Sequence, residues 1–458
     1  MTASRRRSRT SERRISPLNN RTIWLIAASA IIALAAWPSY LHFRASALAA
    51  SDPILQLPVA PVQADFLKRD KMIAFYESRY KKDPGDMITP RTLSGQYLQR
   101  YRERGDVGDV LRAEDAAKTS LIAQKHGNVV GEMALASADI SLHRFREAKA
   151  AMQRAYAVDT SNYEIAMSIA SVDLELGQYD EASHLIESNS SKAGIPASVI
   201  AARLDEIDGH LEEATRLVTR AMHYADSIYE LPAERRAWLH FRVGELHFLA
   251  GDNAGAIALE REALTIFPDD FNAYQALARI AEADKRHDEA EAAAKAGSAL
   301  VPSPEILGIL ADEQGVHGES AAVAATRAEI DAVEKLGNAQ HVNDRLIAMY
   351  DADHDIKTAD AYNIAKQELA VRDDVYAEDT LAWCAAKAGR WDEARSAAAK
   401  AIRFDTQDPR IQYHVGVVAQ HFGDKAEAAK RFNRALELNS KFSAFQADDA
   451  RARLAALK

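Results

Sequence analysis

Small apolar residues recur along the chain at one fixed place relative to short polar segments. The step between successive alanines is the same from 148 to 182, from 256 to 290 and from 394 to 428, while the step from 182 to 214 is slightly shorter and that from 214 to 256 is longer. An acidic residue stands directly before most of these alanines, as is typical of the first turn of a helix, whose positive end favours anions. The alanines are Ala148, Ala182, Ala214, Ala256, Ala290, Ala394 and Ala428.

Two further small positions accompany each of these alanines. The residue seven positions later is usually small, and so is the residue twelve positions earlier. Small residues at fixed offsets mark places where two helices approach closely. A glycine often lies between the earlier small residue and the repeating alanine, where it ends the first helix. The pattern predicts a helix, a tight turn and an antiparallel helix, repeated and stacked because one pair cannot bury its apolar face alone. The earlier small residues are Ala136, Ala170, Ala202, Gly244, Ala278, Ala382 and Gly416.

This joint pattern resembles the tetratricopeptide repeat, a helix–turn–helix unit of about 34 residues. The resemblance implies an all-α fold, a right-handed α-solenoid over residues 66–458. Good repeats are expected over about 129–302 and 375–440, and weaker copies between and before them. Segment 66–84 resembles a lone second helix, and 443–457 resembles a C-terminal capping helix.

The N-terminal part of the chain differs from this repeating body. Residues 1–21 carry seven arginines and one glutamate, and residues 22–43 contain no charged side chain. Twenty-two residues of helix span about 33 Å, close to the thickness of a bilayer core. Trp24 lies near one end of this stretch, and Trp37 and Tyr40 lie near the other. We therefore predict a basic cytoplasmic tail followed by one transmembrane signal anchor.

A cleaved signal peptide is the alternative for this segment, because Ala45–Ala47 and Ala47–Ala49 both fit a small-x-small cleavage site. Both interpretations export the body, since arginines stay on the cytoplasmic side. Residues 44–65 contain three prolines and are expected to form a linker. The prediction is a single-pass protein of a bacterial inner membrane, with its N-terminus cytoplasmic and its solenoid periplasmic or otherwise extracytoplasmic.

Charge and composition narrow the function. The chain has 67 acidic and 57 basic residues and a single cysteine. An acidic body argues against nucleic acid as a partner, and one cysteine argues against disulfides or a cysteine-based zinc site. Asp351, Asp353 and Asp355 resemble the start of a calcium loop, but Ile356 and Tyr362 stand where glycine and glutamate are required. We expect a solvated turn there, no metal site and no cofactor.

No catalytic motif stands out, so the sequence favours a non-enzymatic protein–protein interaction scaffold that binds a peptide or protein. In the tetratricopeptide family the concave face uses first-helix positions 2, 5, 9 and 12. The resemblance therefore implies these candidate partner-binding residues: Trp238, Phe241, Glu245, Phe248, Tyr376, Trp383 and Tyr413. Two alternatives stay open. One is an accessory or enzymatic role with a cryptic site in 303–374, and the other is a cleaved, soluble exported repeat protein.

Overall fold

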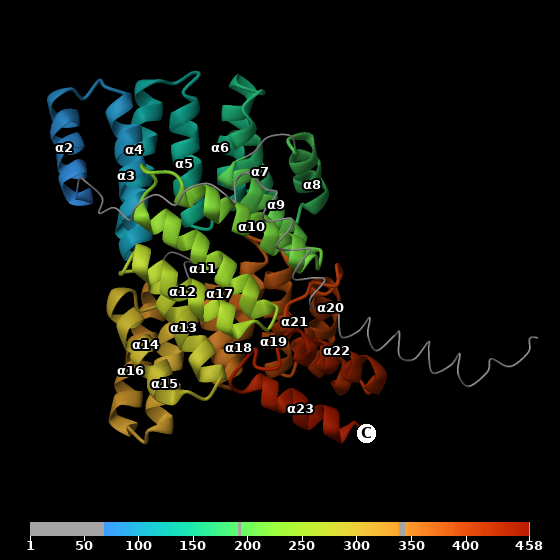
Figure 1. Ribbon diagram of the computed structural model, residues 1–458. Coiled ribbons are helices and arrows are strands. Elements are labelled where there is room, and N and C mark those ends of the chain that lie inside the picture. Colours follow the sequence, from blue (N-terminus) through green and yellow to red (C-terminus); the bar gives the residue numbers. More distant parts are fainter. Residues whose placement is uncertain (1–67, 191–193, 339–343, 458) are drawn as a thin grey trace, which may run out of the picture. The chain divides into compact units, whose positions relative to one another are not determined.

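A computed structural model describes residues 68–190, 194–338 and 344–457, and within these ranges the chain forms 22 helices and no strand (Figure 1). The first half contains α2 (Arg69–Lys82), α3 (Ile88–Arg104), α4 (Val107–Ala123), α5 (Val129–Ser141), α6 (Phe145–Val158), α7 (Tyr163–Glu175), α8 (Tyr179–Ser188), α9 (Ile195–Ile207), α10 (Leu211–Asp226), α11 (Ala233–Leu249) and α12 (Asn253–Ile266).

The second half continues with further helices of similar length. They are α13 (Phe271–Ala283), α14 (His287–Leu300), α15 (Pro304–Val316), α16 (Ser320–Asn338), α17 (Asp344–Asp353), α18 (Thr358–Glu368), α19 (Val375–Lys387), α20 (Trp391–Ala401), α21 (Pro409–His421), α22 (Lys425–Leu438) and α23 (Gln446–Ala456). The longer alanine step, from 214 to 256, corresponds to the long helices α10 and α11, which have 16 and 17 residues.

Consecutive helices pack as pairs, and each pair packs against the next. The most extensive contacts join the two helices of one pair, such as α3 with α4, α11 with α12 and α19 with α20. The second helix of a pair then contacts the first helix of the following pair, as α10 contacts α11. This arrangement confirms the predicted all-α solenoid of paired, tetratricopeptide-like helices.

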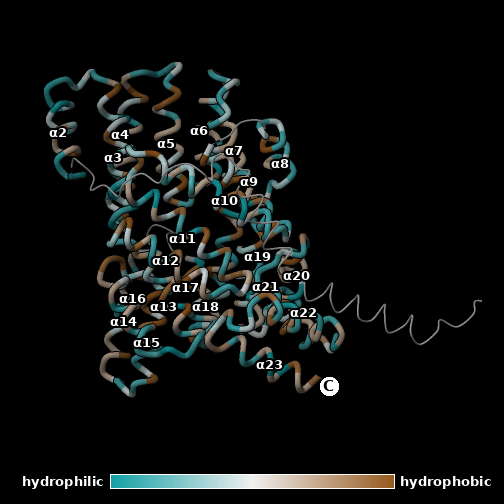
Figure 2. The backbone as a smooth tube through the Cα atoms, in the orientation of Figure 1, coloured by the Kyte–Doolittle hydropathy of each residue, from teal (hydrophilic) through white to brown (hydrophobic). Residues whose placement is uncertain are grey.

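The recurring small residues lie where the paired helices touch. Ala148, Ala182, Ala394 and Ala428 are all fully buried, at 0% exposure. Apolar and polar residues alternate along many of the helices (Figure 2), whereas α19 is buried at every position from Ala377 to Ala386. Larger apolar side chains such as Phe432, which is also fully buried, fill the space between helices. The prediction that the alanines mark close helix contacts is confirmed.

Polar side chains set the starting points of the first helices. The Asn162 side chain accepts a hydrogen bond from the backbone N–H of Glu164 at 3.1 Å, and the Asp408 side chain accepts one from Arg410 at 2.8 Å. Asp270 caps α13 in the same way. Such caps satisfy N–H groups that have no partner within the helix. They fix the starts of α7, α13 and α21, three of the helices that line the cavity described below.

Within the unit Pro58–Lys458, the later pairs contact the turns of earlier pairs; we call these the return contacts. The Tyr179 hydroxyl accepts a hydrogen bond from the backbone N–H of Val375 at 3.0 Å, although the two residues lie far apart in the sequence. The Thr406 hydroxyl donates to the carbonyl oxygen of Ile207 at 2.7 Å. The Asn439 side chain donates to the carbonyl oxygen of Phe248 at 2.7 Å. These contacts join α7–α12 to the loops that precede α19, α21 and α23.

The N-terminal predictions fall on residues that the structure does not describe. The tail 1–21, the anchor 22–43 and the linker 44–65 with its neighbours up to 67 lie outside the described ranges. Among the helices that are described, none combines the length and the apolar character needed to cross a membrane. The helix α2 lies in segment 66–84, and α23 lies in segment 443–457.

Candidate functional site

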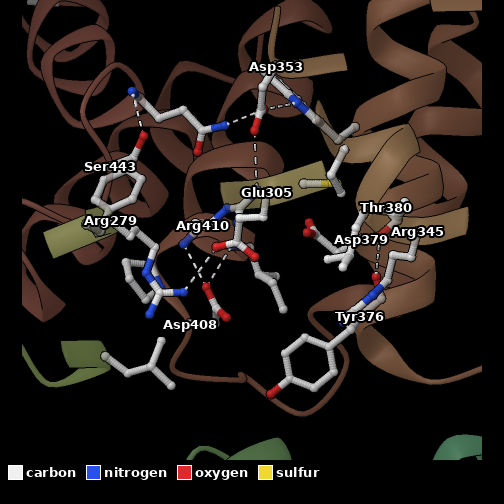
Figure 3. A pocket seen from close by; sticks show the side chains of 18 of the residues that line it. Arg279, Glu305, Arg345, Asp353, Tyr376, Asp379, Thr380, Asp408, Arg410 and Ser443 are labelled. Carbon is white, nitrogen blue, oxygen red and sulfur yellow. Dashed lines mark hydrogen bonds and ion pairs between the residues drawn. The ribbon is translucent and has the colours of Figure 1, made fainter. Parts of the chain in front are cut away.

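The inner helices of the pairs surround a cavity of about 1030 Å³. Its wall comes from the first helices of successive pairs, α7, α9, α11, α13, α15, α17, α19 and α21, and from the segment that leads into α23. Charged and polar side chains of the wall form two groups (Figure 3). One group contains Arg279, Glu305, Asp408 and Arg410, and the other, on the opposite side, contains Arg345, Tyr376 and Asp379.

All seven side chains predicted as partner-binding residues line this cavity. They come from three helices, α11, α19 and α21, that lie far apart in the sequence. Trp238 and Phe241 contribute apolar surface to the wall, and Trp238 is half-buried. The structure thus brings the predicted set together, while its binding role stays a prediction.

Three of the predicted aromatic residues are buried and so less accessible than expected: Phe248, Trp383 and Tyr413. Trp383 is 4% exposed, and its indole Nε1–H donates to the carboxylate of Asp353 at 2.8 Å. Its ring stacks on His414, with 4.3 Å between the centroids. Tyr413 is 3% exposed and donates its hydroxyl to Asp449 at 2.6 Å. Their own chain already satisfies these polar groups, so Trp383 and Tyr413 form the floor of the cavity.

The remaining predicted residues belong to networks with arginines. Glu245 forms an ion pair with Arg279, whose guanidinium also lies 4.8 Å from the ring centre of the buried Phe248. Tyr376 donates its hydroxyl to Glu206 at 3.1 Å, and the guanidinium of Arg203 lies 4.2 Å from the ring centre of Tyr376. The cavity wall is therefore held in shape by charged hydrogen bonds as well as by apolar packing.

Glu206 is the centre of the network on α9. It accepts from Arg203 at 2.9 Å and from Arg242 at 2.9 Å. Burial opposes its ionisation, but the charge of Arg203 and then that of Arg242 outweigh burial and lower the pKa of Glu206. The carboxylate is charged and fully paired, so it stabilises the wall of the cavity by holding Arg203, Arg242 and Tyr376 in place.

The three aspartates near the end of α17 correct one expectation. Asp351 is buried, at 2% exposure, and burial raises the pKa of its carboxyl to about 6. Asp353 receives hydrogen bonds from Trp383 and from Gln446, each at 2.8 Å. The predicted solvated turn is therefore wrong for Asp351, which the fold buries, whereas Asp353 stays exposed while it accepts hydrogen bonds from α19 and α23. Within the described residues no cluster of His, Cys, Asp or Glu has the arrangement of a metal site.

Residues 303–374, where an enzymatic alternative places a cryptic site, do contribute polar groups to the cavity. Among them, His354 is the side chain best suited to acid–base chemistry. Its ring Nε2 lies 2.9 Å from Asp312, and its Nδ1 lies 2.8 Å from the carbonyl oxygen of Tyr350. Burial disfavours its charged form, yet Asp312 outweighs burial and raises the pKa of His354 to about 9. A charged imidazole with both nitrogens engaged does not act as a general base in this arrangement.

Several charged residues of the wall were not among the predicted site residues. Arg203, Glu206, Arg279 and Glu282 all line the cavity. They occupy positions 9 and 12 of the units that start at 195 and 271, so the same positional rule identifies them when it is applied to every unit. Arg345 has no such signal, because it falls between the rule's positions in a weaker repeat.

Comparison with known proteins agrees with the architecture. Residues 247–312 match the family model described as tetratricopeptide repeat, so this part of the chain contains such repeats. No curated protein matches the chain.

Several solved structures resemble the chain at low identity. One is a structure of the human IFIT1 dimer with PPP-AAAA, at 14% identity and a TM-score of 0.43, covering 81% of this chain and 78% of that one. Yeast Tom70 is similar at 12% identity and a TM-score of 0.34, covering 85% and 92%. A tetratricopeptide repeat protein from Parabacteroides merdae gives 16% identity and a TM-score of 0.39, covering 53% and 91%. At these values the matches carry no argument about function.

Proposed function

We propose that this chain is a non-enzymatic protein–protein interaction scaffold that binds a segment of a partner protein in the cavity. The observation that carries the proposal is the convergence of aromatic residues from separate repeats on one cavity of about 1030 Å³. A cavity of this size lies at the upper end of the range for small-molecule sites and is large enough for several side chains of a peptide. Aromatic residues at concave, partly desolvated positions are frequent centres of binding energy.

Site-specific photo-crosslinking tests this proposal. A photoreactive phenylalanine analogue at Phe241 faces the cavity, while the same analogue at Phe75, which is 60% exposed and lies outside the cavity wall, serves as the control. We expect a discrete protein adduct from position 241, weakened when Trp238 is replaced by alanine. Equal adducts from both positions, or none from position 241, would contradict the proposal.

We also propose that residues 22–43 anchor the scaffold in a bacterial inner membrane, with the solenoid extracytoplasmic. The support is the order of basic tail, uncharged stretch and proline-containing linker in the sequence. A C-terminal fusion to a reporter that is active only outside the cytoplasm should give signal. Activity of a cytoplasm-only reporter at the same position would refute the topology. The mass of the mature N-terminus distinguishes an anchored chain from a cleaved one.

A further inference from the structure

The charged side chains of the cavity wall are paired with one another, with two exceptions. Among the described residues, every other charged residue that lines the cavity forms a hydrogen bond or ion pair through its side chain, whereas Arg345 and Glu282 form none. One unpaired guanidinium and one unpaired carboxyl group therefore face the same cavity. Burying a charge without a partner is costly, so a ligand group of opposite charge would be stabilised beside either of the two side chains.

Arg345 lies in the first turn of α17, on the side of the cavity where Tyr376 and Thr380 lie (Figure 3). Beside it the cavity continues into a smaller space of about 310 Å³, whose wall includes Arg345, Arg372 and Glu175. The three acidic groups whose charges act on Arg345 are occupied, because Arg372 forms ion pairs with Glu175, Asp374 and Glu368. Burial, followed by the charge of Arg372, lowers the pKa of Arg345, which is the effect expected of a desolvated guanidinium without an anion.

Glu282 lies in the last turn of α13 and lines the same cavity as Arg345. The two cations whose charges act on Glu282 are engaged elsewhere, His354 with Asp312 at 2.9 Å and Lys285 with Asp448 at 3.5 Å. Burial, followed by the charges of Asp312 and Glu313, raises the pKa of Glu282 to about 8. A cationic group beside Glu282 would reverse this effect and restore the carboxylate at neutral pH.

The length of α17 gives the scale of the separation between the two groups. Arg345 is the second residue of α17, and His354, whose charge acts on Glu282, follows its last residue. Nine residues at about 1.5 Å per residue place the two ends of the helix about 13 Å apart. An extended peptide advances about 3.3 Å per residue, so the same distance corresponds to about four residues.

We infer that the cavity selects an extended partner segment that places a carboxylate against Arg345 and, about four residues away, a basic side chain against Glu282. The inference rests on the proposed function and adds the chemistry of the ligand. The cavity wall has more acidic than basic residues, and its only unpaired cation among the described residues is Arg345. A polyanion such as a nucleic acid would therefore meet mostly repulsion. Apolar side chains of the segment would contact Trp238 and Phe241.

Binding of defined peptides to the full chain in detergent tests this inference. The probe is a fluorescein-labelled nine-residue peptide of alanine and leucine that carries one glutamate and one lysine four residues apart. Two companion peptides serve as controls. One carries glutamine at both charged positions, and the other carries the glutamate and the lysine at adjacent positions. Fluorescence anisotropy gives the affinity of each. We expect the first peptide to bind roughly tenfold or more tightly than either companion.

Two substitutions connect the peptide charges to the residues. R345Q and E282Q should each reduce the affinity of the charged peptide roughly tenfold and leave that of the glutamine peptide unchanged. R154Q and E437Q are matched controls, because both side chains are exposed and lie outside the cavity wall. Since neither Arg345 nor Glu282 has a partner in the described chain, R345Q and E282Q should also keep the thermal midpoint of the parent protein or raise it.

The failures are distinguishable. Equal binding of all peptides, or binding that R345Q and E282Q leave unchanged, overturns the inference but not the proposed function. So does a clear fall in the thermal midpoint of R345Q, because it would show that Arg345 has a structural partner. If no peptide binds while crosslinking from Phe241 captures a protein, the charge rule is wrong and the scaffold remains. If both experiments fail, the proposed function fails as well.

Discussion

Comparing the stability of the variants G251A and G423A measures what a return contact contributes to the free energy of unfolding. The two glycines end the first helices α11 and α21 with φ angles of 78° and 77°, and an aspartate that caps the next helix follows each of them. A methyl group on Gly251 would lie 2.6 Å from the carbonyl oxygen of Leu438, whereas a methyl group on Gly423 would meet nothing within 4 Å.

The difference between the two variants isolates the contact. Both pay for a left-handed conformation with a side chain, about 1–2 kcal/mol, partly offset because alanine reduces the freedom of the unfolded chain. Only G251A must also push the Leu438 carbonyl away, and overpacking of this kind costs about 1–3 kcal/mol. The shift also strains the hydrogen bond from the Asn439 side chain to the carbonyl oxygen of Phe248, which is 2.7 Å long. We expect G251A to lose about 2–4 kcal/mol more than G423A.

Urea denaturation followed by far-ultraviolet circular dichroism gives the free energy of unfolding of the two variants. Solenoids can unfold in steps, so native-state hydrogen exchange at the backbone N–H of Asn439 and its neighbours provides a local measure. In G251A these amides should lose protection, and in G423A they should keep it. If the two variants differ by less than about 0.5 kcal/mol and exchange alike, the return contact does not stabilise the fold.

Three further outcomes follow from buried side chains. Glu260 is fully buried and its carboxyl oxygens have no hydrogen-bond partner; burial, followed by the charge of Glu245, raises its pKa to about 10. The folded chain then keeps a proton that the unfolded chain releases above about pH 4.5, so stability should fall by about 1.4 kcal/mol per pH unit between the two pKa values. E260Q should flatten this slope in denaturation at pH 5 and pH 8; an unchanged slope would assign the pH dependence to other groups. A394L, at a fully buried helix contact, should cost about 1–3 kcal/mol or more in urea denaturation, and the idea of close contact fails if it is neutral. Cys384 is buried and burial raises the pKa of its thiol, so a thiol reagent should label it in urea but not in buffer, and rapid labelling of the native chain would contradict its burial.

Local periodicity accounts for the parts of the fold that the sequence predicts. Ala148 and Ala428 belong to an early and a late unit of the chain, yet each is buried for the same reason, because a small side chain lets two neighbouring helices approach. The positional rule for the concave face then places Trp238 and Phe241 on the cavity wall. Both predictions need only the register within one unit, which a repeated sequence displays directly.

Contacts between distant units account for what the sequence does not predict. Trp383 and Asp353 belong to different units, and the hydrogen bond that Asp353 accepts from Gln446 comes from a segment much later in the chain. No local sequence pattern shows which distant units are joined by the return contacts. The unpaired state of Arg345 is harder still, because it depends on Arg372 having satisfied the acidic groups around it.

The return contacts also constrain how such a chain can change its length. Gly105 lies beside Val301, Gly177 beside Asp373 and Gly209 beside Asp405, and the separation along the sequence is identical in the three pairs. Repeat proteins commonly evolve by duplication or loss of whole units, because each unit touches only its neighbours. Here an added or deleted unit between two such partners would leave every glycine facing the wrong loop. These contacts therefore require a fixed number of repeats between the partners.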